Sequence, residues 1–157
     1  MRMFWLAAAS VALLSNAAMA AGDTDAFRHL TREQAFALVA KPDPAGKPVS
    51  NYLARHDDFS EAVIQRTRSG DVEVHELYSD YMVMVEGTGT LTIGGTLKNR
   101  RAKPDGSKGE WLADSSSGGK VYDLKPGVMV TVPKGMPHWV QLPKGGTLKY
   151  IFFKRKG

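Results

Sequence analysis

The stretch GVMVTVPKGMPHWVQ, residues 127–141, decides how the rest of the chain is interpreted. Valines alternate with other residues over 128–132, which is typical of a β-strand with one buried face. Pro133 ends that strand because it has no amide hydrogen to donate to a neighbouring strand. Gly135 can adopt the positive φ of a tight turn. The chain is therefore expected to re-enter a sheet at His138, with its imidazole aimed inward from a fixed position.

A second stretch, GDVEVHELYSDYMVMVEG at 70–87, supplies an acid partner for that histidine. Side chains alternate along a strand, so Glu73 and His75 share one face. A turn then starts the next strand, and Asp80 lies at its beginning. Such a hairpin brings the Asp80 carboxylate beside the imidazole of His75. Two imidazoles and one carboxylate that converge in this way are typical of a facial metal site.

These stretches resemble the two sequence motifs of the cupin family, over roughly residues 70–153. The second family motif, G-x5-P-x-G-x2-H-x3-N, is matched at four positions: Gly127, Pro133, Gly135 and His138. Its final asparagine falls on Leu142, with Gln141 one place away. This match implies an all-β fold, a small RmlC-like jelly-roll barrel, and commonly a bound divalent metal ion.

The first family motif, G-x5-H-x-H-x3-4-E-x6-G, is matched less well. Counting back from Gly87 puts Asp80 at the glutamate position, His75 at the second histidine and Glu73 at the first. A register with His75 as the first histidine leaves Leu77 as the second and shortens the spacing to Asp80. The resemblance therefore implies metal ligands at His75, Asp80 and His138, with either Glu73 or a water molecule as a fourth.

The donor set of nitrogen and oxygen atoms suits zinc or manganese first, with iron, nickel or copper as alternatives. A metal-free barrel, in which both imidazoles hydrogen-bond to Asp80 and to water, is the competing hypothesis. We expect a pocket for a small organic ligand next to the site, formed by Met82, Met84, Val130 and Trp111. Whether the protein is a metal-dependent enzyme or a non-catalytic ligand-binding or sensing module stays open, and a purely structural exported partner protein is a weaker third hypothesis.

The remaining pattern predicts one barrel preceded by a short helix. Thr31 and Gln34 have the spacing of a capping box, which predicts a helix over 32–40 in an N-terminal arm at 21–50. From residue 51 to 157 we expect the cupin barrel, built from nine strands at 51–56, 62–68, 71–77, 80–87, 88–95, 120–124, 128–133, 138–142 and 147–154. The polar segment 99–119 is expected to be a long loop, with a role as a lid or as a plain insertion.

Residues 1–20 have the pattern of a signal peptide. A positive start is followed by a short apolar run and by Ala18-Met19-Ala20, which predicts cleavage after Ala20. An uncleaved membrane anchor is the alternative, although the apolar run is short for a span. We therefore expect a periplasmic or secreted protein that does not associate with a membrane after cleavage.

Composition excludes several other classes of protein. Removal of 20 residues from the 157 leaves 137, which suit one domain, and the chain has no cysteine, so any metal must be held by nitrogen and oxygen ligands. The formal net charge is +5, yet the basic residues do not alternate with aromatic ones, so we expect no nucleic-acid partner. His29 and His56 are expected at the surface. Val72 and Val74 are expected to face outward, which favours a homodimer.

Overall fold

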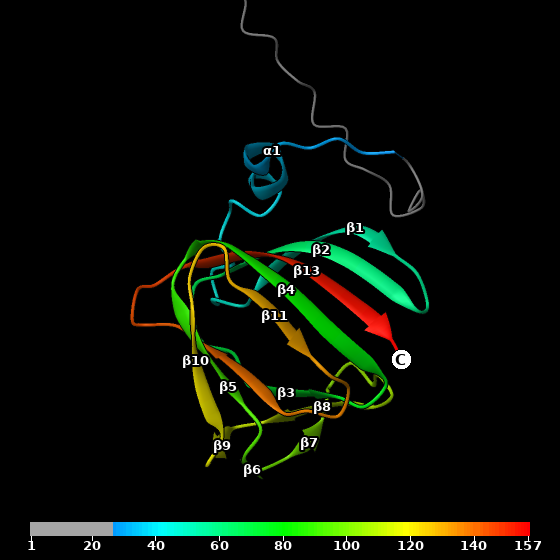
Figure 1. The fold of residues 1–157 in the computed structure, drawn as a ribbon, viewed down its shortest axis with the longest axis vertical. Coiled ribbons are helices and arrows are strands. Elements are labelled where there is room, and N and C mark those ends of the chain that lie inside the picture. Colours follow the sequence, from blue (N-terminus) through cyan, green and yellow to red (C-terminus); the bar gives the residue numbers. More distant parts are fainter. Residues whose placement is uncertain (1–26) are drawn as a thin grey trace, which may run out of the picture.

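The computed structural model describes residues 27–157, and the expected signal peptide lies outside them. Two antiparallel sheets face each other (Figure 1). The first has the order β1 (Val49–Arg55), β2 (Phe59–Arg66), β13 (Leu148–Lys156), β4 (Tyr78–Gly87) and β11 (Met129–Val132). The second has the order β10 (Lys120–Leu124), β5 (Gly89–Ile93), β12 (His138–Gln141), β3 (Val72–His75), β8 (Glu110–Ala113) and β7 (Arg101–Ala102). A small third sheet pairs β6 (Thr96–Lys98) with β9 (Ser115–Ser117).

Sequence neighbours are mostly separated within the sheets, as in a jelly roll. Strand β13, the last in the chain, lies between β2 and β4, while β12 lies between β5 and β3. Within residues 27–157 no strand pairing joins the two large sheets, so the barrel is open along the edges formed by β10 and β11. The predicted all-β jelly roll with a short N-terminal helix is therefore confirmed as a fold class.

All nine strands expected from the sequence are present, with ends that differ by a few residues. The prediction of a long loop over 99–119 is wrong. That segment contains β7, β8 and β9, and β8 pairs with β3 along its whole length. Polar composition hid these strands, because they bury few large apolar side chains and so lack the strong alternation of the others.

Alternation along the strands fills the space between the sheets with apolar side chains. The inward cluster contains Ala62, Ile64, Met82, Met84, Leu91, Leu124, Val132, Val140, Leu148 and Tyr150. Strand β4 illustrates the period of two, because Asp80, Met82 and Met84 are buried whereas Tyr81 is exposed. One end of this interior is thus apolar, and the other end carries the ionisable residues.

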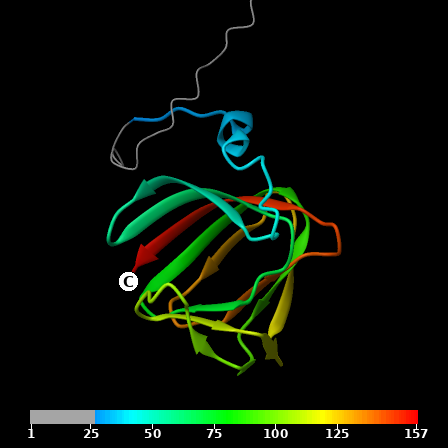
Figure 2. The same cartoon turned by 180° about the vertical axis from the view of Figure 1, so that it is seen from behind.

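Helix α1 (Arg32–Ala37) packs on the outer face of the five-stranded sheet (Figure 2). Its predicted capping box is present, because the Thr31 side chain accepts from the Gln34 amide and the Gln34 side chain accepts from the Thr31 amide. Phe36 and Val39 are buried against Val63 of β2. The helix ends three residues before the predicted end. The following amides bond three residues back, as in a tighter turn, ahead of the prolines that cannot continue a helix.

Of two predictions about surface residues, one is confirmed and the other is wrong. His29 and His56 are exposed, as expected. Val72 and Val74 are only 0% and 4% exposed, so they are covered and cannot form an outward apolar patch. The prediction of a homodimer rested on these two valines, and their burial removes that support. In the described part of the chain, the one helix is far too short to cross a membrane.

Candidate metal centre

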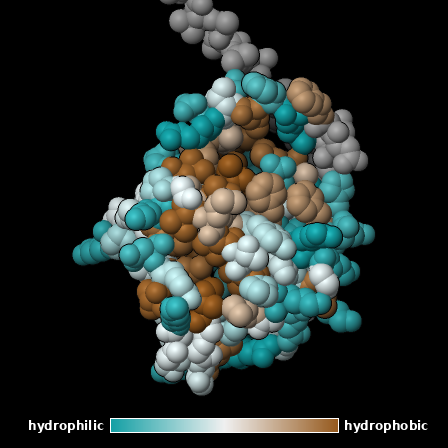
Figure 3. Space-filling model, viewed as in Figure 1, coloured by the Kyte–Doolittle hydropathy of each residue, from teal (hydrophilic) through white to brown (hydrophobic). Residues whose placement is uncertain are grey.

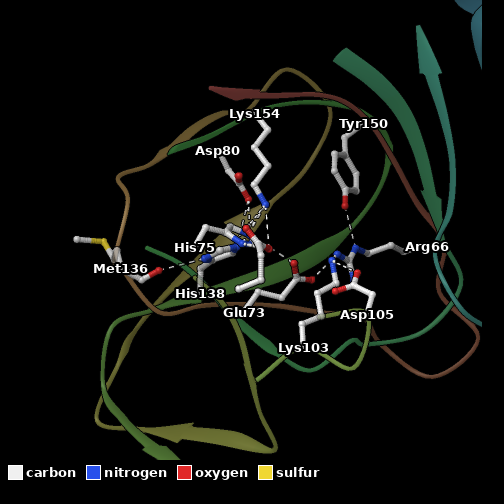
Figure 4. Close-up of polar contacts among 11 residues, drawn as sticks. Arg66, Glu73, His75, Asp80, Lys103, Asp105, Met136, His138, Tyr150 and Lys154 are labelled. Atoms are coloured by element: carbon white, nitrogen blue, oxygen red, sulfur yellow. Dashed lines mark hydrogen bonds and ion pairs between the residues drawn. The ribbon is translucent and has the colours of Figure 1, made fainter. Parts of the chain in front are cut away.

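Strand register brings the predicted ligands to one end of the barrel interior. His138 on β12 lies directly opposite Glu73 on β3, and directly opposite residues in antiparallel strands place their side chains on the same face. His75 is two residues after Glu73 and therefore shares that face. Asp80 approaches from β4 of the other sheet (Figure 4). Both sheets thus contribute to one cluster between them.

The donor atoms of this cluster are close enough to share one ion. Glu73, His75 and His138 offer atoms that all lie within 4.8 Å of one another. Asp80 Oδ2 is 3.1 Å from Nε2 of His75 and 3.3 Å from Nε2 of His138, and Glu73 Oε2 is 3.5 Å from Nε2 of His75. Ligand bonds of about 2.1 Å at octahedral or tetrahedral angles separate neighbouring donors by about 3.0 to 3.4 Å. The observed spacings are close to that range.

The opposite nitrogen of each imidazole has its own acceptor. Nδ1 of His75 lies 2.6 Å from Oε2 of Glu110, and Nδ1 of His138 lies 3.1 Å from the carbonyl oxygen of Met136. A proton on either Nδ1 has an acceptor beside it, and both Nε2 atoms face the carboxylates. Nζ of Lys154, which donates to Glu110, also lies 3.0 Å from Nδ1 of His75. Metal-binding histidines are oriented in this way, by a carboxylate or a backbone carbonyl behind the ring.

The same geometry also suits a protonated His75 in the absence of metal. Burial alone disfavours the charged imidazolium and is the largest single influence on its pKa. The hydrogen bonds to Asp80 and Glu110 outweigh burial and raise the pKa of His75 to about 9. An imidazolium with a carboxylate at each nitrogen is the arrangement expected of the metal-free hypothesis.

The acids of the cluster are held in their charged forms. Burial favours protonation of Asp80, but hydrogen bonds from His138 and His75 lower the pKa of this carboxyl well below its usual range. Burial likewise opposes the charge on Glu73, and the nearby Arg66 guanidinium together with the two imidazoles lowers its pKa. The buried Asp80 and the half-buried Glu73 therefore stay negative and need a positive partner.

Counting charges shows that the cluster lacks one positive charge. Three carboxylates, those of Glu73, Asp80 and Glu110, face two permanent cations: Arg66 on Glu73 and Lys154 on Glu110. A protonated imidazole or a bound cation supplies the missing charge. Oδ1 of Asp80 is buried and makes no hydrogen bond to any described residue. A buried carboxylate oxygen without a partner is unfavourable. A bound cation could contact Oδ1, whereas a protonated imidazole would be bonded to Oδ2 and would leave Oδ1 without a partner.

Three further residues of the site were not predicted from the sequence: Glu110, Lys154 and Arg66. Glu110 faces His75 across the β3–β8 pair, and Lys154 Nζ lies 2.9 Å from Oε1 of Glu110. Arg66 donates to Oε1 of Glu73 at 3.1 Å and to the Tyr150 hydroxyl at 2.8 Å. Arg66 and Lys154 had a usable signal, because each continues the inward-facing series of a predicted strand. Glu110 had none, because its strand was taken for a loop.

The expected ligand-pocket residues are divided between three places. Val130 lines an apolar groove of about 560 Å³ at the open side of the barrel, together with Leu91, Ile93, Tyr122, Pro133 and Met136. Met82 and Met84 are packed in the core, 3% and 2% exposed. Trp111 alternates with the inward Glu110 and points to the outer face of β8, where the Arg100 guanidinium lies over its ring. Figure 3 shows apolar side chains gathered on the face that carries this apolar groove.

Known proteins resemble this chain in fold and not in sequence. No protein-family model matches the sequence, and no curated protein sequence matches it either. Among solved structures, the polyketide cyclase RemF from Streptomyces resistomycificus is similar at a TM-score of 0.53 and 16% identity, over 83% of this chain and 80% of that chain.

The cupin domain of Cnp3 from Schizosaccharomyces pombe is similar at a TM-score of 0.51 and 10% identity, and the match covers 70% of this chain and 61% of that domain's chain. An RmlC-like cupin protein from Methanocaldococcus jannaschii matches at a TM-score of 0.48 and 16% identity, over 72% and 84% of the two chains. The fold is that of a cupin, as the strand order and the similarity to the Cnp3 cupin domain show. Its interior carries a His/Glu/His cluster that can hold a metal ion of undetermined identity.

Proposed function

We propose that the protein is an exported cupin that binds a divalent metal ion through His75, His138, Glu73 and Asp80 and acts on a small organic ligand. The observation that carries the proposal is the orientation of the two imidazoles. Each Nε2 faces carboxylate oxygens while each Nδ1 is occupied by an acceptor behind it. The export step rests on the sequence of residues 1–20 alone.

The donor set limits the metal that would be bound. Two imidazole nitrogens and two carboxylates form a site of intermediate hardness, which suits zinc or manganese first and also accepts iron, nickel or copper(II). A bound ion of this kind supplies a Lewis acid for a carbonyl or lowers the pKa of a bound water. This chain's own residues position it, with Glu110 and Met136 fixing the rings and Arg66 holding the second oxygen of Glu73.

The apolar groove offers a place for the organic part of a ligand. It is lined by Ile93, Val130 and Met136, and the carbonyl of Met136 also contacts the His138 ring. A ligand in the groove would thus lie against residues next to the cluster. Small-molecule sites are commonly apolar with a few convergent polar groups, which matches this arrangement.

A metal-free binding or sensing module is the second candidate function. It is favoured by His75, whose two nitrogens each lie beside a carboxylate and whose pKa is raised to about 9. In that case the cluster is a closed network of ion pairs that stiffens one end of the barrel, and the groove binds its ligand without turnover.

Metal analysis of protein purified from the periplasm separates the two candidates. We expect stoichiometric metal in the wild type and in His29→Ala, a control that removes an exposed histidine, and loss of metal in His75→Ala and His138→Ala. A wild type that remains empty and does not gain thermal stability after incubation with zinc or manganese contradicts the metal proposal. Thermal-shift screening of small organic acids and sugars on the metal-bound protein then identifies a bound compound, and analysis of that compound after incubation with the protein shows whether it is consumed.

A further inference from the structure

A second cavity lies on the other side of Glu73 from the imidazoles. Its volume is about 480 Å³, and its lining includes Lys47, Arg66, Arg68, Gly70 and Glu73. We call it the basic cavity. The apolar groove is lined by a different set of residues, so the two cavities are separate.

Arg66 presents unused hydrogen-bond donors to the basic cavity. Its Nε donates to the Tyr150 hydroxyl and one Nη2 hydrogen goes to Glu73, which fixes the plane of the guanidinium. Among the described residues no acceptor bonds to Nη1, although Arg66 as a whole is only 8% exposed. A Cβ placed on Gly70 would lie 2.6 Å from Nη1. Nη1 therefore lies close to the bare backbone of Gly70, which also lines the basic cavity.

Two further cationic side chains lie at the mouth of the basic cavity. Lys47 and Arg68 are exposed, and neither side chain forms an ion pair within the part of the chain that the structure describes. The stem of Arg68 lies across the turn at Gly46, so that a Cβ on this glycine would lie 2.8 Å from Cδ of Arg68. The one other acid in the lining, Asp71, is paired with Arg101 at 2.9 Å. The basic cavity thus carries an excess of positive charge.

We propose that the basic cavity is an anion subsite for the carboxylate or phosphate group of a small ligand. A buried arginine already fixed in plane binds an oxyanion with little loss of side-chain entropy, and charge-assisted bonds of this kind are strong. Lys47 and Arg68 add attraction at the entrance. Glu73 joins the subsite to the metal cluster, because one of its oxygens contacts Arg66 and the other faces His75. That link to a reacting ligand rests on the proposed function; the anion subsite itself does not.

Calorimetric titration with inorganic phosphate and with succinate, at constant ionic strength, tests the subsite and distinguishes phosphate from carboxylate. Both the EDTA-treated and the metal-bound protein are titrated. We expect saturable binding in both forms. The double variant Lys47→Ala/Arg68→Ala and the variant Gly70→Ala, which keeps every charge but displaces Nη1 of Arg66, should each weaken binding by roughly tenfold or more.

Arg155→Ala is the matched control, because it removes an exposed cation on β13 that does not line the basic cavity. It should bind both anions as the wild type does. Equal weakening in this control and in the double variant, or no saturable binding of either anion, overturns the subsite. Binding that appears only with metal and disappears in His138→Ala assigns the anion to the metal and also overturns it. Anion binding by a protein that takes up no metal leaves the subsite standing while the metal proposal fails.

Discussion

The two ends of the barrel interior are built by the same strands, but different interactions stabilise them. Strand β4 contributes Asp80 to one end and Met84 to the other, and β12 contributes His138 and then Val140. At the apolar end each side chain gains stability from burial whatever its partner. At the ionisable end burial is unfavourable for every group, and only specific partners compensate. Single substitutions should therefore have different consequences at the two ends.

Removal of one carboxylate from the ionisable end should have the largest effect. Asp80→Ala leaves both imidazoles without the acid between them, and loss of one partner from a buried ionic network costs about 3–5 kcal/mol. We expect a fall in the free energy of unfolding of roughly this size in urea, together with loss of metal. A variant that keeps the stability and metal content of the wild type would show that Asp80 is not a partner of either ring.

At the apolar end, Met84→Ala should cost about 3 kcal/mol, because it leaves a cavity in a packed core. Its metal content should remain that of the wild type, since its side chain makes no contact with the donor atoms. Met84→Leu keeps the volume and should cost less than about 1.5 kcal/mol. Loss of metal in Met84→Ala under conditions in which it stays folded would mean that the two ends are not independent.

The pH dependence should also separate the two ends. In metal-free protein His75 has a pKa raised to about 9, above its ordinary value of 6.5, so the fold favours the protonated ring. Its contribution is complete below about pH 6.5 and is lost as the pH rises through about 9, by an amount on the order of 3 kcal/mol. Urea unfolding of EDTA-treated wild type should show this loss, and His75→Ala should not.

Glu110→Gln should have the smallest effect of the changes considered. We expect it to weaken metal binding and to leave the fold intact. The amide keeps the shape but holds the His75 ring less firmly, and changes behind a ligating histidine typically cost about 10- to 100-fold in metal affinity. Competition with a chelator measures this change. Glu76→Gln removes an exposed acid from the same region and serves as the control. If wild type and Glu110→Gln bind the metal with equal affinity, Glu110 does not orient His75 and serves only as the ion-pair partner of Lys154.

The sequence predicted the fold from local signals of two kinds. Strong alternation located nine strands, and the Pro-x-Gly turn before His138 located the strand that carries the second imidazole. The capping box located the start of α1. These features depend on neighbours a few residues apart, so their physics can be deduced from the sequence. The weakly patterned segment at 99–119 could not be assigned in this way.

What the sequence determined by itself was the fold class, the inward face of each strong strand and the group of residues from which a metal site would be drawn. Tertiary structure decided which of those side chains meet. It set Glu110 behind His75, placed Arg66 against Glu73 and turned Trp111 outward. The reason is that alternation fixes only the side of a strand on which a residue lies. Contacts between distant strands depend on register and sheet order, which arise when the whole barrel packs.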